Sequence, residues 1–142
     1  MADSIREQIL QAAAALIASE VTPVPVYRSR VDAFSRRQAS AVVIEPGFDR
    51  LTQELSQCKL DWEFSLSIAI YTRGQVPDQL ADPIVQKVHE ALMVERTLGG
   101  LALHVTPVSI DPQLEAGDEP SGWIQMVYAV RYRTQLTALD AQ

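Results

Sequence analysis

Apolar and polar side chains alternate without a break across the twelve positions from Lys59 to Ile70. Every second residue is large and apolar: Leu60, Trp62, Phe64, Leu66, Ile68 and Ile70. The residues between them are small, polar or charged, so one side of the segment suits a protein core and the other suits water. This period of two predicts a long antiparallel strand with one buried face, which ends at Arg73-Gly74.

The end of the chain repeats this alternation and predicts another strand of the same kind. Its apolar positions are Ile124, Met126, Tyr128, Val130 and Tyr132, and the positions between them are Gln125, Val127, Ala129, Arg131 and Arg133. Strands with one apolar face need other elements to cover that face.

Two amphipathic helices are predicted to supply this cover. Ser4 and Glu7 have the spacing of a capping box, and the apolar residues behind them share one helical face. We therefore expect a first helix from about Ser4 to Ser19. Asp82-Pro83 offers a cap and a first-turn proline ahead of an apolar arc, which predicts a second helix from there to about Arg96.

The segments around these elements are less regular. A short extended piece is expected from Val24 to Arg30, and residues 31–39 lack a clear period and are expected to form a loop. The β-branched run from Ala41 to Glu45 predicts a short strand that stops at Pro46-Gly47.

After the second helix, a strand is expected to begin at Leu101 and to be broken by Pro107, with a polar loop over residues 111–122. The order helix, strands, helix, strands predicts an α+β fold, with one mostly antiparallel β-sheet and two α-helices packed on it. The length of 142 residues favours a single domain over residues 1–142.

Composition narrows the functional classes. The net charge of −6 argues against general nucleic-acid binding, because neutralising phosphates requires a basic surface. The single cysteine, Cys58, cannot form an internal disulfide, which fits a reducing compartment. The first residues lack the pattern of a signal peptide, and the apolar run from Ala12 to Ala18 is far shorter than the roughly 20 residues that span a bilayer. We therefore expect a soluble intracellular product that binds no membrane.

Gly99 and Gly100 raise the question of a phosphate-binding loop. Such a loop follows a strand and opens a helix, so that the free N–H groups of the helix face the anion. Here the order is reversed, because the glycines follow the predicted helix and precede a strand. They are therefore interpreted as a helix end and a turn.

The other chemically active residues form no recognisable constellation. His89, His104 and Cys58 lack the spacing of a metal site. A Cys–His dyad remains an open alternative because both residue types are present, although no spacing argues for it. Asp61 and Glu63 share one strand face, where a solvated surface explains them better than a catalytic pair. The sequence predicts no catalytic residue, no cofactor and no metal, and hence a protein that is not an enzyme.

Arginine supplies ten of the twelve basic residues. Its planar fork of donors suits protein interfaces, although a genome rich in G and C would produce the same bias. The candidate interface residues are Arg28 and Arg30 on the first strand, Phe34, Arg36 and Arg37 in the loop, and Arg131 and Arg133 on the last strand. Two interpretations stay open for them: solvated surface charge, or contact with carboxylates of a partner.

The segments "VHEALMVERTLGGLAL" and "VYAVRYRT" resemble the tail terminator, or tail-completion, proteins of long-tailed bacteriophages and prophages, the family of the minor tail protein U. The early "VPVYRSR" and "SAVVIEPG" are similar to that family's first strand and the strand after its loop. By order of elements the resemblance covers nearly the whole chain. Its motifs are short, and the matching positions are Leu98, Gly99, Gly100, Tyr132, Arg133 and Thr134.

The resemblance implies a structural protein of the virion with no catalytic or cofactor residues. Members of that family form a ring, typically six-fold, that caps the finished tail tube, stops its polymerisation and presents the surface for head–tail joining. It also implies the partners: further copies of the chain, the major tail tube protein and the head–tail connector proteins. The implied location is the head-proximal end of the tail, after assembly in the bacterial cytoplasm.

Other functions stay open at this point. A neck or head-completion protein of the virion shares the size and the oligomeric habit. A small cytosolic binding module would lack the ring, and a small enzyme would use residues that only the fold brings together.

Overall fold

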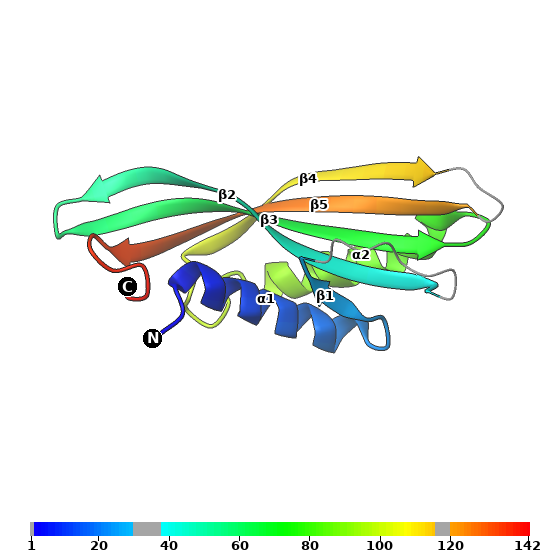
Figure 1. The fold of residues 1–142 in the computed structure, drawn as a ribbon, viewed down its shortest axis with the longest axis horizontal. Helices are drawn as coiled ribbons and strands as arrows, with labels where there is room; N and C mark the ends of the chain where they lie inside the picture. Colours follow the sequence, from blue (N-terminus) through cyan, green and yellow to red (C-terminus); the bar gives the residue numbers. More distant parts are fainter. Residues whose placement is uncertain (1, 30–37, 116–119) are drawn as a thin grey trace.

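The computed structural model describes residues 2–29, 38–115 and 120–142. Within these residues, two helices and five strands follow each other: α1 (Ile5–Val21), β1 (Val26–Arg28), β2 (Ser40–Leu55), β3 (Lys59–Arg73), α2 (Pro77–Val94), β4 (His104–Glu115) and β5 (Ser121–Gln135). The strands form one sheet and both helices pack on it, which confirms the α+β prediction (Figure 1). Among the described residues, neither helix is long and apolar enough to cross a membrane.

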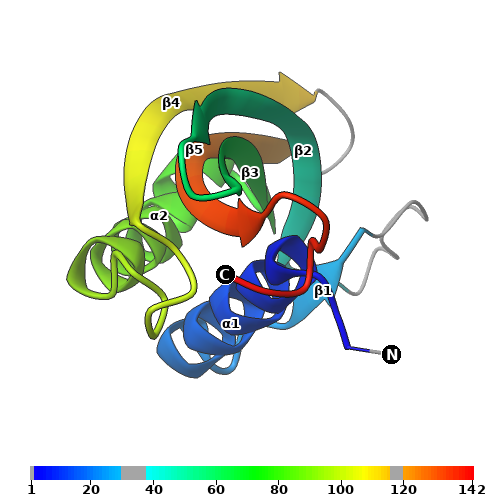
Figure 2. The same cartoon turned by 90° about the vertical axis from the view of Figure 1, so that its left-hand side faces the viewer.

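The sheet has the strand order β1-β2-β3-β5-β4. Among the described strands, β1 and β2 run parallel, and the pairs β2–β3, β3–β5 and β5–β4 are antiparallel. The centre is the β3–β5 pair, which is in register from Lys59↔Gln135 to Arg73↔Ser121. Viewed along this pair, the sheet curls, with β2 and β4 as the strands on either side of β3 and β5 (Figure 2).

The core lies between the helices and one face of this sheet. Phe64, Leu66, Ile68 and Ile70 of β3 are fully buried, as the period of two predicts, while Trp62 is half-buried. The indole Nε1 of Trp62 donates a hydrogen bond of 3.0 Å to Thr134 Oγ1. The helices contribute the buried residues Ile9, Ala13 and Ile17 from α1 and Ile84, Val88 and Leu92 from α2.

Helix α1 begins as predicted and ends two residues later than expected, at Val21. The backbone N–H of Glu7 donates to Ser4 Oγ at 3.1 Å, so the serine half of the capping box forms. The Glu7 carboxylate instead accepts hydrogen bonds from Arg28 and Gln11. Capping spacing alone predicts the start of this helix but not the partner of its acidic residue.

Helix α2 contradicts the predicted start at Asp82-Pro83, because it begins at Pro77 and places Pro83 inside the helix. Pro77 occupies the first turn, where a proline loses no intrahelical bond. Pro83 removes one bond, yet Ala81 and Ile84 beside it are buried. Burial on the sheet therefore outweighs the local proline signal.

Strand β2 does not stop at Pro46-Gly47 but continues to Leu55, with a register shift against β3 between Pro46 and Asp49. A Cβ built on Gly47 would lie 2.7 Å from the Ser65 carbonyl oxygen, so the glycine allows a close approach to β3. The Pro-Gly pair marks a β-bulge rather than a turn.

Strand β4 likewise runs through Pro107 and continues to Glu115, into residues predicted to be a polar loop. Its register against β5 shifts between Pro107 and Ser109. β4 is an edge strand, so a proline can be placed where its missing N–H faces the open side and no hydrogen bond to a neighbouring strand is lost. Strand β1, Val26–Arg28, is shorter than the predicted piece from Val24 to Arg30.

The glycine pair lies in a turn, as predicted. Gly99 and Gly100 have φ angles of +73° and +90°, in the left-handed region that glycine adopts most readily. Helix α2 has already ended at Val94, so the glycines shape the connection to β4 rather than the helix end itself.

Candidate assembly surface

Arg28, the first of the predicted interface residues, is bound within its own chain. Its Nη1 and Nη2 donate to the two carboxylate oxygens of Glu7 at 3.0 and 3.1 Å. This paired geometry joins β1 to the first turn of α1. The hydrogen bonds from Arg28 lower the pKa of the Glu7 carboxyl, against the opposing effect of partial burial.

Arg133 makes the same kind of contact across the central strand pair. Its Nε and Nη2 donate to the Asp61 carboxylate at 2.7 and 3.1 Å. Only 8% of Asp61 is exposed, so the arginine compensates a carboxylate that has little access to water. The hydrogen bonds from Arg133 lower the pKa of Asp61.

Arg131 shares one carboxylate with Arg50. Glu63 Oε2 lies 3.8 Å from Arg131 Nε and 3.4 Å from Arg50 Nη2. Two guanidinium groups around one carboxylate leave an excess of positive charge on this part of the sheet. Sequence reasoning missed Arg50, because its segment was expected to lie beyond the end of a short strand.

The remaining predicted interface residues, Arg30, Phe34, Arg36 and Arg37, lie outside the described residues. The structure therefore places Arg28 near α1 and brings Arg131 and Arg133 together on the sheet face that bears Asp61 and Glu63. The sequence-based interpretation of a solvated face is wrong for Asp61, which is buried, whereas Glu63 is partly exposed. Arginines pair with both carboxylates.

The two β-bulges expose large apolar side chains on this same sheet face. Phe48 lies in the bulge of β2 and is 75% exposed, and Val108 lies in the bulge of β4 and is 61% exposed. Together they line a groove of about 280 Å³ whose floor includes Ser65 and Ala129. Small floor residues between two apolar walls make the groove a recess for side chains. We call it the bulge groove.

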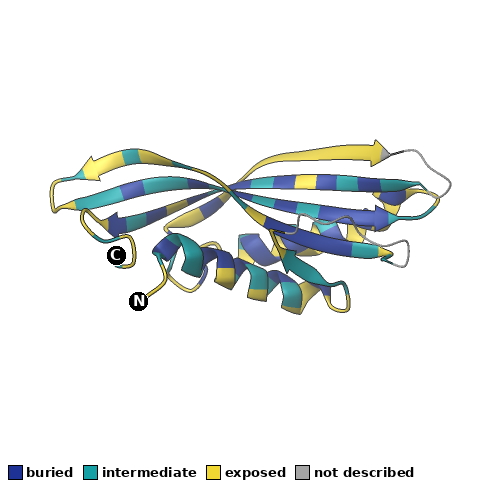
Figure 3. Ribbon diagram, viewed as in Figure 1, coloured by how far each residue is buried: buried dark blue, intermediate teal, exposed yellow. Residues whose placement is uncertain are grey.

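The edge strand β4 is exposed beyond the bulge. Every residue from 106 to 114 is exposed, and Figure 3 shows this along the strand. Ile110 is 56% exposed and Leu114 is 66% exposed, so two large apolar side chains stand on an open sheet edge. We call residues 110–114 the β4 edge segment.

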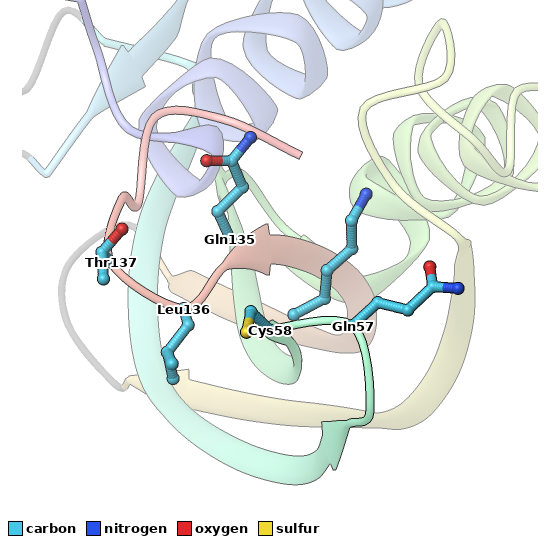
Figure 4. A pocket seen from close by; sticks show the side chains of 6 residues that line it. Gln57, Cys58, Gln135, Leu136 and Thr137 are labelled. Atoms are coloured by element: carbon cyan, nitrogen blue, oxygen red, sulfur yellow. The ribbon is translucent and has the colours of Figure 1, made fainter.

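A second hollow lies at the end of the β2–β3 hairpin, against the end of β5. It is an open depression of about 280 Å³ whose lining includes Cys58, Lys59, Gln135 and Leu136. Figure 4 labels Cys58, Gln135 and Leu136 among the side chains around it. Cys58 has a φ of +57° and is exposed in the turn. The residues that line this depression form no recognisable catalytic arrangement.

The histidines lie on different elements, His89 on α2 and His104 at the start of β4, and Cys58 lies in the turn between β2 and β3. His89 Nδ1 lies 2.9 Å from the hydroxyl of Tyr128, and burial raises the pKa of that tyrosine to about 12. His104 is exposed on β4 and is the register partner of Arg131. No group of three His, Cys, Asp or Glu residues within residues 2–29, 38–115 and 120–142 is arranged to hold a metal ion.

No family model matches the chain, and no curated protein matches its sequence. A chain from the virion of a native gene transfer agent particle is 11% identical, with a TM-score of 0.46 over 92% of this chain and 92% of that chain. Another solved structure, whose name states no function, is 12% identical, with a TM-score of 0.47 over 87% of this chain and 94% of that chain. At such low identities and TM-scores, these similarities carry no conclusion about function.

Proposed function

We propose that the protein is a structural component of a bacteriophage or prophage virion, and more finely a tail terminator protein. In this role copies of the chain form a ring on the head-proximal end of the tail tube, stop its polymerisation and provide the surface for head–tail joining. The partners would be further copies of the chain, the major tail tube protein and the connector proteins. No cofactor, metal or catalytic step is part of the proposal.

The observation that carries an assembly role is the exposed apolar surface of the sheet. Phe48, Val108, Ile110 and Leu114 are large, apolar and more than half exposed. Isolated exposed side chains need no explanation, but these gather at the bulge groove and along the adjoining open edge. The register divides them into two groups, because Phe48 and Val108 line the groove whereas Ile110 and Leu114 pair with Met126 and Gly122 and lie on the helix side of the sheet. Exposed apolar groups of this kind are typical of protein interaction sites. The resemblance in "LGG" and "YRT" supports the tail terminator among assembly proteins.

The test is to add the purified chain to tail tubes from a phage that lacks its terminator. We expect electron microscopy to show a ring at one end of each tube and tail lengths that no longer increase. Native mass spectrometry of the concentrated protein should show a closed oligomer larger than a dimer. Binding to the connector without binding to tube ends would instead identify a neck protein. A protein that stays a symmetric dimer and ignores tubes would contradict the proposal.

A further inference from the structure

The bulge groove and the β4 edge segment differ in shape and charge, which is the requirement for a head-to-tail contact between identical chains. A closed ring needs such a heterologous contact, in which one patch meets a different patch of the next copy. The groove is a recess with apolar walls, and the β4 edge segment is an open edge with apolar side chains.

The β4 edge segment is poorly suited to main-chain hydrogen bonding with a partner strand. Pro112 lies in the middle of the β4 edge segment, and Pro107 lies at the bulge beside it. Proline has no N–H to donate, and prolines are a recognised means of preventing edge-to-edge sheet extension. A partner that covers this edge must therefore be held mainly by side-chain contacts.

The bulge groove and the β4 edge segment also carry complementary charges. Arg50 and Glu63 line the bulge groove, and Glu63 also faces Arg131 beside it, so two guanidinium groups surround one carboxylate at the groove. In the β4 edge segment, Asp111 is exposed and forms no ion pair with any described residue. The carboxylate of Asp111, between Ile110 and Pro112, is therefore complementary to the positive charge at the groove.

The strand geometry allows both matches at once. Side chains alternate along a strand, so Ile110 and Leu114 project from one side of β4 and Asp111 from the other. In the groove, Val108 belongs to the wall made by β4, whereas Phe48 and Arg50 belong to the opposite wall made by β2. An edge that enters the groove between these walls sets its apolar side against Val108 and its acidic side against Arg50.

We infer that the β4 edge segment of one copy docks into the bulge groove of the next copy, with Asp111 paired to Arg50. This contact rests on the proposed ring and specifies which surfaces of the chain build it. The groove is the receiving patch, and the edge is the inserted patch.

A charge swap tests the contact. Asp111→Arg alone and Arg50→Asp alone should each weaken self-association about tenfold, since each places like charges together. The two changes in one chain should restore association to about the level of the wild type. Sedimentation velocity measures the association, and thermal melting confirms that each variant is folded. Lys87→Asp and Asp78→Arg on α2 are matched reversals that should leave self-association unchanged.

Disulfide trapping gives an independent readout in a Cys58→Ser background. A chain with Phe48→Cys mixed with a chain with Asp111→Cys should form crosslinked dimers, and neither should do so alone. Both changes in one chain should give a ladder of multimers beyond the dimer, as expected for a heterologous contact. Crosslinking that stops at the dimer would overturn the head-to-tail arrangement.

The outcomes separate this inference from the proposed function. If the charge variants and the wild type assemble and cap tubes equally, the docking contact is wrong and the terminator proposal stands. A wild-type protein that neither self-associates nor binds tube ends would overturn both.

Discussion

Arg133 donates two hydrogen bonds to Asp61 across the β3–β5 ladder, and only 8% of that aspartate is exposed. The contact lowers the pKa of Asp61 below the ordinary aspartate value of about 3.9. A lowered folded-state pKa means that the ionised carboxylate stabilises the folded chain at higher pH. That stabilisation is complete above the unfolded pKa and is lost as pH falls through the folded pKa.

Asp61→Asn should therefore lower the melting temperature at neutral pH, because it removes the charged acceptor of both hydrogen bonds. The difference from the wild type should shrink as the pH falls below about 4, where the wild-type carboxylate also becomes neutral. Calorimetry over this pH range measures the effect. Glu54→Gln, on an exposed position of β2, is the control. A difference in melting temperature between wild type and variant that stays constant at all pH values would show that ionisation of Asp61 does not stabilise the fold.

Two phenylalanines separate the core from the groove. Phe64 is fully buried, so Phe64→Ala should destabilise the chain by roughly 3–5 kcal/mol. Phe48 is mostly exposed, so Phe48→Ala should change stability by less than about 0.5 kcal/mol. Urea unfolding measures both values. Equal losses would mean that the bulge groove is part of the core, and an unchanged Phe64→Ala variant would contradict the buried face of β3.

Gly47 allows β2 to cross Ser65 closely at the bulge. Gly47→Ala would place a Cβ 2.7 Å from the Ser65 carbonyl oxygen, and a backbone atom there cannot move aside cheaply. We expect a loss of roughly 1–3 kcal/mol in the free energy of unfolding. Glu45→Ala, an exposed change on the same strand, should have little effect. A neutral Gly47→Ala would show that the two strands lie farther apart than the structure has them.

Tyr128 provides a test at alkaline pH. Burial raises its pKa to about 12, so its hydroxyl stays neutral in the folded chain when a free tyrosine, with a pKa of about 10, would ionise. The folded state loses stability as pH rises from about 10 towards 12, because the unfolded chain releases the proton more readily. Ultraviolet titration should show late tyrosine ionisation that Tyr128→Phe reduces but does not abolish, because burial and the hydrogen bond to Asp49 also raise the pKa of Tyr132. If all tyrosines titrate near pH 10 while the chain is folded, the burial of Tyr128 is wrong.

The sequence predicted β3, β5, α1 and the covered sheet because each follows a regular hydrophobic period. The same reasoning failed where backbone signals compete with tertiary packing. Pro46-Gly47 and Pro107 have the local signature of strand ends, yet pairing with β3 and β5 carries both strands through as bulges. Pro83 gave the wrong helix start for a similar reason.

The bulge groove could not be predicted for the same reason as the bulges that form it. Phe48 and Val108 come together only once β2 and β4 flank the central pair in the correct register. The arginines were recognisable by type, but their partners were not. The Asp61–Arg133 pair depends on the register of two strands that are distant in the sequence.

The arginines now divide into two groups with different expected effects. Arg28 and Arg133 each hold two oxygens of a carboxylate in their own chain. Arg28→Glu and Arg133→Glu should therefore lower the melting temperature, since each places two acids together. Thermal melting of the isolated chain measures this. An unchanged melting temperature would show that these two arginines do not stabilise the folded chain.

Arg36 and Arg37 lie outside the described residues, and the prediction for them rests on the sequence, where they stand with Phe34 in an aperiodic segment. Arginine and aromatic residues are favoured in protein contacts. Reversing both arginines to glutamate should leave the chain folded while it weakens ring formation or tail joining. The measurement is paired: thermal melting, and complementation of a terminator-deficient phage by the variant. Arg131→Glu serves as the comparison variant on the sheet, because it places a second acid beside Glu63. Normal infectivity of the double variant would remove Arg36 and Arg37 from the assembly mechanism, and loss of folding would show that the two charges stabilise the chain itself.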